Sequence, residues 1–402
     1  MRILVQKFGG TSVASRESRL EAIRHIEQAL DEGYRVVVVV SAMGRRGEPY
    51  ATDTLLGIVD DTDTVAKRDL DILMSCGESI SSVVFASLLR SCGHDVTVMS
   101  GAQAGIITND QFGNARILDL RPKRLLDELE QGRIVIVMGF QGGTEEGDIT
   151  TLGRGGSDTT ATALGVALDA EYVDIFTDVE GIMTADPRIV KNASRLKQVT
   201  YTEICNLARE GAKVIHPRAV EIAMQKSIPI RVRSTHSDDE GTLVTRSISL
   251  LEGSVLSDRP VTGVTQTARV TQVHVTGKGV GSKDVFSLMA EHDISVDFIS
   301  VTPDHIAYTV ASYESDRAVS ILRESGYEPY VVEDCAKVSV VGAGIAGVPG
   351  IMSRIVAALV SEGIEILQSS DSHTTIWCLV REKEMETAVR ALHRAFHLGT
   401  DE

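Results

Sequence analysis

The strongest constraint on the fold is an alternation of short apolar runs with helical stretches over about the first 245 residues. The clearest run is 36–40, which consists of valine at every position. A strand that is apolar on both faces belongs in a parallel sheet with helices packed on either side. The first part of the chain is therefore predicted to be an α/β domain with a mostly parallel sheet.

Strands and helices alternate along this part of the sequence. The strand candidates are 2–6, 35–41, 95–99, 134–139, 172–177 and 228–232, and the helices between them include 16–32, 79–91 and 158–168. Residues 246–260 are irregular and contain Pro260, which indicates a linker. The predicted first domain therefore covers residues 1–245.

The chain after the linker repeats a unit of strand, helix, strand, strand, helix, strand, which is the ferredoxin-like topology. The first copy is predicted at 261–334 and the second at 335–402. The second copy lacks its last strand, whereas 261–267 is an extra strand-like segment. Because an unpaired edge invites wrong pairing, we expect this segment to complete the second copy's sheet.

Composition excludes several classes of protein. With 402 residues the chain is too long for one ordinary core. A net charge of −16 disfavours nucleic acid and anionic membranes as partners. Apolar runs are too short for a membrane span, and the N-terminus lacks the layout of a signal peptide. Five scattered cysteines without a C-x-x-C pair argue against zinc and disulfides, which predicts a reduced, cytoplasmic setting.

The first candidate site follows the first strand, where Lys7 precedes Gly9 and Gly10. Glycines let the backbone approach a ligand and direct N–H groups at it. A lysine adds a compact, mobile charge, so the segment suits a polyphosphate. The alternative is a tight strand-to-helix turn with a solvated lysine. The spacing is not that of a P-loop.

A second candidate site is the segment 151–158, which precedes a helix. Arg154 can hold a carboxylate through two parallel hydrogen bonds. Gly155 and Gly156 leave room for a phosphoryl group. Helix capping by Ser157 or Asp158 is the alternative interpretation, but capping explains one residue and leaves Arg-Gly-Gly unexplained.

Other polar residues interrupt apolar surroundings. Segment 176–188 leaves a strand through two turns, at the strand end where α/β proteins bind ligands, although loop chemistry alone would also explain it. Lys213 is either a phosphate contact or a surface lysine. Ser41 ends the valine run. Glu78 stands at the predicted start of helix 79–91, as a cap or as a partner for a substrate ammonium.

A glycine motif at 342–347 fits G-x-G-x-x-G after a strand. A dinucleotide-binding domain needs several further strand–helix units, and only 402 − 347 = 55 residues remain. We therefore interpret the motif as a ligand loop of a small regulatory unit.

Together these segments occur in the order seen in aspartate kinases, and the chain resembles that family over its whole length. The resemblance implies an amino-acid-kinase (carbamate-kinase-like) three-layer sandwich followed by two ferredoxin-like ACT units. It also implies transfer of the γ-phosphoryl group of ATP to the β-carboxylate of L-aspartate, giving 4-phospho-L-aspartate and ADP. This step leads toward lysine (through diaminopimelate), threonine and methionine. Mg²⁺ is expected to arrive with ATP, without a metal site on the protein.

The resemblance also implies roles for individual residues. The catalytic set is Lys7, Arg154 and Asp158. The aspartate pocket is formed by Ser41, Thr52, Asp53, Glu78, Arg154, Gly155, Gly156 and Ser157. The nucleotide is surrounded by Lys7, Phe8, Gly9, Gly10, Ser12, Thr177, Asp178, Gly181, Met183, Ala185, Asp186, Arg188, Lys213 and Val214.

Feedback regulation and assembly are implied as well. ACT units suggest a homodimer that is inhibited by lysine, threonine or diaminopimelate. The effector contacts expected in the second unit are Gly347, Val348, Pro349, Gly350, Ile364, Gln368 and Ser369. The loop 277–283 lacks the Pro-Gly that the second unit keeps, so which unit binds the effector stays open.

Two alternatives remain beside this hypothesis. One is a kinase of the same fold that acts on glutamate, N-acetylglutamate or a nucleotide. The other is an amino-acid sensor without catalysis. The ACT units and the pairing of Glu78 with Arg154, which matches an α-amino acid, argue against the first, and the complete set of Lys7, Arg154 and Asp158 argues against the second.

Overall fold

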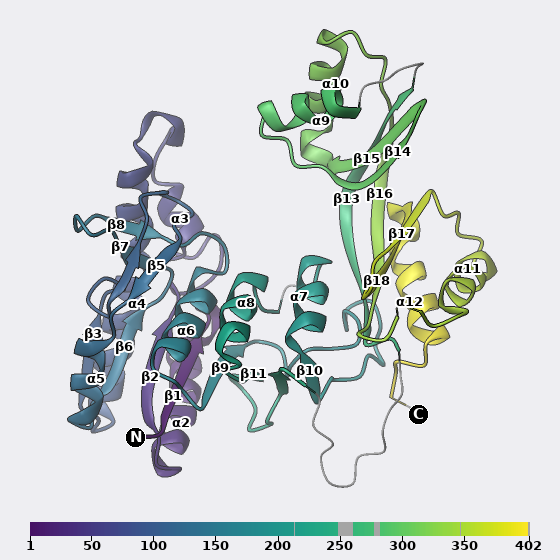
Figure 1. The fold of residues 1–402 in the computed structure, drawn as a ribbon. Coiled ribbons are helices and arrows are strands. Elements are labelled where there is room, and N and C mark those ends of the chain that lie inside the picture. Colours follow the sequence, from purple (N-terminus) through teal and green to yellow (C-terminus); the bar gives the residue numbers. More distant parts are fainter. Residues whose placement is uncertain (213, 248–259, 277–281, 346, 401–402) are drawn as a thin grey trace. The chain divides into compact units, whose positions relative to one another are not determined.

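The computed structural model describes residues 1–212, 214–247, 260–276, 282–345 and 347–400. They form two compact units (Figure 1). Unit 1 comprises Met1–Ile182, Arg195–Ala208 and Lys213–Val255. Unit 2 comprises Met183–Ser194, Arg209–Ala212 and Leu256–Glu402. Most of the predicted linker 246–260 lies outside the described residues.

The described residues of unit 1 build an eight-stranded sheet with the order β10-β12-β11-β9-β1-β2-β6-β3. Neighbouring strands are parallel except for β11 and β12. The strands are β1 (Ile3–Phe8), β2 (Arg35–Val40), β3 (Val96–Met99), β6 (Ile134–Met138), β9 (Tyr172–Thr177), β10 (Gln198–Thr200), β11 (Ile230–Ser234) and β12 (Thr242–Thr245). The predicted mostly parallel sheet is confirmed.

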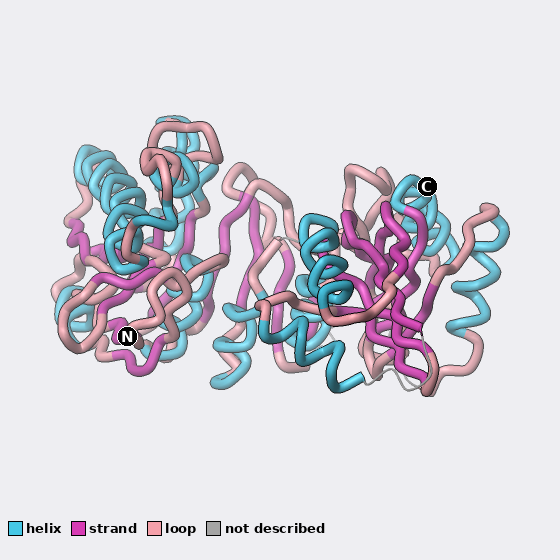
Figure 2. The backbone as a smooth tube through the Cα atoms, turned by 90° about the horizontal axis from the view of Figure 1, so that it is seen from above, coloured by secondary structure: helices cyan, strands magenta, loops and turns pink. Residues whose placement is uncertain are grey.

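Helices cover both faces of this sheet (Figure 2). On one face, α2 and α4 pack against Leu4, Phe8 and the even-numbered valines of β2. On the other face α6 lies so close that a Cβ on Gly165 would come within 2.3 Å of a methyl group of Val173. The helices of unit 1 are α1 (Gly10–Ala14), α2 (Arg16–Asp31), α3 (Thr52–Leu56), α4 (Lys67–Ser91), α5 (Lys123–Glu130), α6 (Gly156–Ala167), α7 (Tyr201–Arg209) and α8 (Pro217–Lys226), with the 3₁₀ turn η1 (Thr62–Thr64).

A small four-stranded sheet was not predicted. Its order is β5-β4-β7-β8, and its strands are β4 (Ile106–Thr108), β5 (Ile117–Leu120), β7 (Gln141–Gly143) and β8 (Ile149–Thr151). Strands of three or four residues that contain glycine, threonine and aspartate carry no apolar pattern long enough to detect. This sheet positions the segment that leads from β8 into α6.

Helix α4 is longer than predicted, because it begins at Lys67 and not at residue 79. By length and composition alone it could cross a membrane. However, 44% of its apolar window is buried in the protein, and the helix packs against β3, β6 and β8. These contacts identify α4 as the core helix of a globular unit.

Unit 2 contains a six-stranded antiparallel sheet with the order β14-β15-β13-β16-β18-β17 among its described residues. Its strands are β13 (Gly263–Thr276), β14 (Asp297–Thr302), β15 (His305–Ala311), β16 (Tyr330–Val341), β17 (Gln368–Asp371) and β18 (Thr375–Arg381). Its helices are α9 (Ser282–Glu291), α10 (Ser315–Glu324), α11 (Ile351–Ser361) and α12 (Met385–Ala395), with the 3₁₀ turns η2 (Ser312–Glu314) and η3 (Glu382–Glu384).

Two long strands run through both ferredoxin-like repeats. Residues 263–267 of β13 pair with 337–341 of β16, and residues 272–274 pair with 330–332. The segment predicted to complete the second copy is thus the first half of β13. The predicted boundary between residues 334 and 335 falls inside β16, because the two copies share one continuous sheet.

Two segments of the predicted first domain group with unit 2. Ala185 and Val190, from Met183–Ser194, are buried in the same apolar cluster as Val338 and Ile355. In Arg209–Ala212, the Glu210 carboxylate lies 3.1 Å from Lys337 Nζ and accepts a hydrogen bond of 2.8 Å from Ser339 Oγ. Packing partners more than a hundred residues away are invisible to local sequence patterns.

Replacing Lys337 with methionine is expected to destabilise unit 2 by about 3 kcal/mol, because it leaves the buried Glu210 carboxylate without its cation. The change is measured as a shift in the urea midpoint, followed by the fluorescence of Trp377, the single tryptophan of the chain. The control is Arg390→Met, which removes an exposed pair with Glu386 and should cost less than about 0.5 kcal/mol. Equal shifts of the urea midpoint for the two variants would show that the buried pair contributes no more to stability than the exposed pair.

Candidate functional site

A cleft of about 460 Å³ lies in unit 1. The predicted site residues that line it are Lys7, Gly10, Ser41, Thr52, Asp53, Glu78, Arg154, Gly155, Gly156, Ser157 and Asp158. They come from segments that are up to 151 residues apart in the sequence. The fold thus gathers the predicted catalytic residues and the predicted aspartate pocket in one cavity.

The sheet explains why these segments meet. Strands β1 and β2 are parallel neighbours, with Phe8 opposite Val40. Their carboxyl ends therefore reach the same edge, so Gly9, Gly10 and Ser41 emerge side by side. Parallel strands of open α/β sheets present ligand sites at this edge. A short helix that was not predicted, α1, begins at Gly10, and the predicted helix 16–32 follows it as α2.

The central ion pair of the cleft joins Lys7 to Asp158. Lys7 Nζ lies 2.7 Å from Asp158 Oδ1, and the two side chains are only 13% and 12% exposed. Asp158 belongs to the first turn of α6, and its other oxygen accepts a hydrogen bond of 3.4 Å from the His216 backbone N–H. The pair therefore fixes the ammonium at the mouth of the glycine turn.

Glycines are required where the cleft walls touch each other. A Cβ on Gly155 would lie 2.2 Å from the His216 side chain, and the residue has a φ of 69°. A Cβ on Gly156 would lie 2.6 Å from the Phe140 ring. A Cβ on Gly10 would lie 2.6 Å from the Gly44 carbonyl oxygen. Gly44 and Phe140 line the cleft, and no sequence pattern pointed to them or to His216.

Glu78 is a buried carboxylate that faces the cleft. It lies in the middle of α4, so the interpretation as a cap at a helix start is wrong. Its Oε1 accepts a hydrogen bond of 3.0 Å from the Ala42 N–H. Its Oε2 has no hydrogen-bond partner among the described residues. Burial raises the pKa of Glu78 to about 8, so a ligand cation is what would favour its charged form.

Asp71 supports the cleft from behind. It is fully buried, and it accepts hydrogen bonds from the Gly113 N–H and from both the N–H and the hydroxyl group of Thr151, at 2.7–3.0 Å. Gly113 lines the cleft, and Thr151 leads into the segment that carries Arg154. Asp71 thus holds two walls at a fixed distance, and no motif in the sequence indicated it.

The sequence matches known families over both units. The pattern of the amino acid kinase family covers residues 2–234, and an ACT domain pattern covers residues 330–394. Aspartokinase 1 of Bacillus subtilis (strain 168) is 58% identical, over 99% of this chain and 100% of that protein. The chain belongs to the aspartokinase family.

More distant aspartokinases agree. The aspartokinase of Geobacillus stearothermophilus is 39% identical over 100% of this chain and 98% of its own length. The crystal structure of E. coli aspartokinase III in complex with aspartate and ADP superimposes with a TM-score of 0.79 at 27% identity, covering 98% of this chain and 99% of that one. The expected family and fold class are confirmed along the whole chain.

Most residues that the aspartokinase resemblance assigned to the nucleotide lie outside the 460 Å³ cleft. The side chain of Phe8 is fully buried and stacks on Phe176 at 4.7 Å, and its carbonyl oxygen accepts a hydrogen bond of 3.2 Å from the Ser41 N–H. The Ser12 hydroxyl group is hydrogen-bonded to that of Thr235 at 2.7 Å. Those outside the cleft in unit 1 are Phe8, Gly9, Ser12, Thr177, Asp178, Gly181 and Val214, and Lys213 lies outside the described residues.

Four further residues that the resemblance assigned to the nucleotide, Met183, Ala185, Asp186 and Arg188, belong to unit 2. Ala185 is buried in the core of that unit, and Met183 packs against the same cluster. Asp186 pairs with the exposed Arg188 at 2.7 Å. These four residues therefore belong to a different unit from Lys7.

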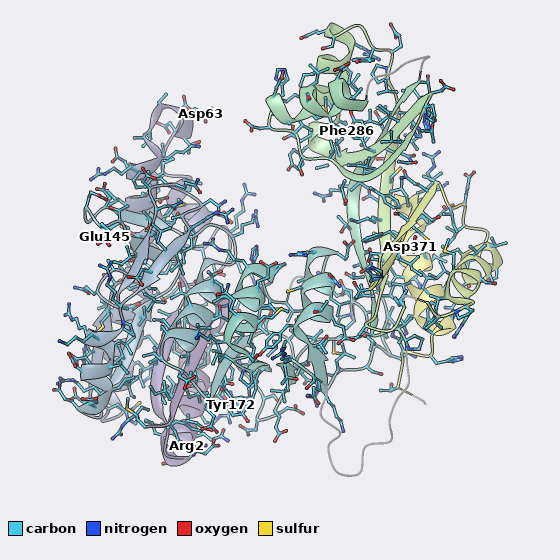
Figure 3. The ribbon with its side chains drawn as sticks, viewed as in Figure 1. Arg2, Asp63, Glu145, Tyr172, Phe286 and Asp371 are labelled. Carbon is cyan, nitrogen blue, oxygen red and sulfur yellow. The ribbon has the colours of Figure 1, made fainter. Side chains whose placement is uncertain are left out.

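A second cleft, of about 720 Å³, lies in unit 2. Gly347, Val348 and Gly350 line it, together with Asp371 at the end of β17, which is labelled in Figure 3, and residues of the turn that follows. The other predicted effector residues do not line it. Ile364 is buried in the core, Gln368 is hydrogen-bonded to Gln272 at 2.7 Å, Ser369 pairs with Cys378, and Pro349 is exposed.

The raised pKa of Glu78 predicts a pH dependence of stability. A neutral Glu78 stabilises the unliganded protein fully below its unfolded pKa, and this contribution is lost as the pH rises through about 8. Glu78→Gln stays neutral, so its melting temperature should exceed that of the wild type more at about pH 8.5 than at about pH 5.5. The control is Glu130→Gln on the exposed end of α5. Its melting temperature should differ from that of the wild type by the same amount at both pH values. A constant difference between Glu78→Gln and the wild type would contradict the assignment.

Proposed function

We propose that the chain is an aspartate kinase, which transfers the γ-phosphoryl group of ATP to the β-carboxylate of L-aspartate and yields 4-phospho-L-aspartate and ADP. The observation that carries the proposal is the charge pattern of the 460 Å³ cleft. Arg154, Glu78 and Lys7 provide a cation for an α-carboxylate, a carboxylate for an α-ammonium and a cation for a phosphoryl group. The proposal is also supported by relatives that are named aspartokinase and that match this chain over almost their full length.

The reaction needs no general base, because the β-carboxylate of aspartate is ionised at pH 7. Arg154 would hold the α-carboxylate by two hydrogen bonds, and Glu78 would hold the ammonium. A carboxylate oxygen then forms a bond to the γ-phosphorus while the bond to the bridging oxygen of ADP breaks. Lys7 stabilises the charge that develops, and Asp158 keeps Lys7 in place at 2.7 Å.

Mg²⁺ is proposed to enter with ATP and to neutralise phosphate charge when bound. Among the described residues no group of three or more His, Cys, Asp or Glu side chains is arranged to hold a metal ion. Mg²⁺ usually keeps several waters and is bound by substrate phosphates and one or two carboxylates.

We infer that the product leads toward lysine by way of diaminopimelate, and toward threonine and methionine. The scattered cysteines without a C-x-x-C pair support a reduced, cytoplasmic setting for the enzyme. We infer feedback inhibition through unit 2 and a homodimer formed by its ACT units. The E. coli relative has been crystallised with lysine and aspartate in a T-state (TM-score 0.75, 27% identity). A kinase for glutamate or N-acetylglutamate is the alternative, and the ACT match argues against it.

Catalysis is tested with ATP and individual amino acids in an assay coupled to ADP release. Lys7→Met is expected to lower kcat at least about a hundredfold, because Lys7 acts on charge in the transition state. Arg154→Ala should mainly raise KM for aspartate, by about tenfold or more. Arg121→Ala, which removes an exposed pair with Glu145, is the control and should match the wild type. Activity with glutamate but not aspartate would refute the proposal.

Regulation is tested by adding lysine, threonine and diaminopimelate, singly and in pairs. Val348→Asp is expected to raise the half-inhibitory concentration at least about tenfold while leaving kcat unchanged, because the new carboxylate repels that of the effector. Val360→Asp, at an exposed site on α11 that does not line the 720 Å³ cleft, is the matched control. A flat response of the wild type to every mixture, in a protein that light scattering shows to be monomeric, would overturn both the effector site and the dimer.

A further inference from the structure

The segments that follow three neighbouring strands carry a cation, a glycine turn and a carboxylate at one edge of the sheet. Strand β1 lies between β2 and β9, with Phe8 opposite both Val40 and Phe176. The chain continues from β1 into Gly9 and Gly10, from β2 toward Arg45 and from β9 toward Asp178. The groups that follow β2 and β9 therefore stand on opposite sides of the Gly9–Gly10 turn.

An ion pair joins these two sides. Arg45 Nη2 lies 2.5 Å from Asp178 Oδ2, and the Thr177 hydroxyl group donates a hydrogen bond of 3.2 Å to the other oxygen of Asp178. Because β1 separates β2 from β9, the Arg45–Asp178 pair spans the end of β1 and the turn that follows it.

The loop that carries Arg45 also rests on the glycine turn. The Gly44 N–H donates a hydrogen bond of 3.0 Å to the Gly10 carbonyl oxygen. The Cα atom of Gly10 lies so close that a Cβ would come within 2.6 Å of the Gly44 oxygen. The backbone next to Arg45 is thus held at a short, fixed distance from the turn.

Arg45 has the freedom to exchange its partner. It lines the cleft together with Lys7 and Arg154. Its side chain is 66% exposed and that of Asp178 is 48% exposed, so the pair contributes little to stability. A nucleotide di- or triphosphate brings several negative charges, and a guanidinium binds phosphate oxygens through two hydrogen bonds at once.

We propose that Arg45 is a phosphate-binding residue, whose guanidinium leaves Asp178 for the terminal phosphates of the nucleotide above the Gly9–Gly10 turn. The inference rests on the proposed kinase function, because that function supplies the nucleotide. Asp178 holds the guanidinium over the turn while the site is empty, which reduces the reorganisation needed on binding.

The test is calorimetric titration of ATP, ADP and AMP, with Mg²⁺, into the wild type and the variants Arg45→Ala and Arg45→Lys. Arg45→Ala should weaken binding of ATP and ADP by about tenfold to a hundredfold. AMP lacks the terminal phosphates, so its affinity for Arg45→Ala should equal its affinity for the wild type within about twofold. Arg45→Lys should be intermediate, because lysine keeps the charge without the fork. In turnover, KM for ATP should rise and KM for aspartate should stay constant.

The control is Arg68→Ala, which removes an arginine that is 50% exposed, pairs with Asp148 and does not line the cleft. Its affinities should equal those of the wild type, and both alanine variants should keep the wild-type melting temperature. Unchanged ADP affinity in Arg45→Ala would overturn the proposal, as would an equal loss for AMP and ADP or a rise in KM for aspartate alone.

The same data separate this inference from the proposed function. If the wild type does not phosphorylate aspartate but Arg45→Ala still weakens ADP binding selectively, only the aspartate kinase activity is refuted. If aspartate is phosphorylated and Arg45→Ala binds ADP with the wild-type affinity, only the phosphate-binding role is refuted. A wild type that binds neither ATP nor ADP overturns both.

Discussion

The parallel pairing of β9, β1 and β2 is the constraint on which the rest of the site depends. It brings three strand ends to one edge and places the Gly9–Gly10 turn between the groups that follow the outer strands. Helix α6 then packs on the sheet through Gly165 and directs its first turn at the same edge. The Lys7–Asp158 pair joins strand and helix there, so the positions of both depend on the sheet.

The chain has a net charge of −16, yet several cationic side chains line the cleft. The cations of the cleft stand against a strongly acidic background, which favours anionic ligands at this place and disfavours them elsewhere. In the proposed function Glu78 adds selectivity, because burial disfavours its charged form until a cation binds. A ligand with both an α-carboxylate and an α-ammonium satisfies this arrangement, and a simple dicarboxylate does not.

The sequence predicts six of the eight strands of the large sheet, and the predicted 172–177 coincides with β9. It misses β10 and β12, because strands of three and four residues are too short to carry a clear apolar pattern. It also predicts the cleft residues that sit on glycine-rich turns. It fails where structure depends on distant partners: Asp71 is recognisable only through its contacts with Gly113 and Thr151. The helix predicted to start at residue 79 in fact begins at Lys67, so Glu78 lies within α4. Met183–Ser194 joined unit 2 because its apolar residues pack against strands far along the chain.

The central claim is that one cleft in unit 1 binds the amino acid and presents it to the phosphoryl group. The most direct measurement is a crystal structure of the protein with L-aspartate and a non-hydrolysable ATP analogue. The predicted result is an α-carboxylate held by Arg154, an ammonium held by Glu78 Oε2 and a β-carboxylate that points toward the terminal phosphate beside Lys7. Aspartate bound outside this cleft, or bound with its α-carboxylate away from Arg154, would contradict the claim.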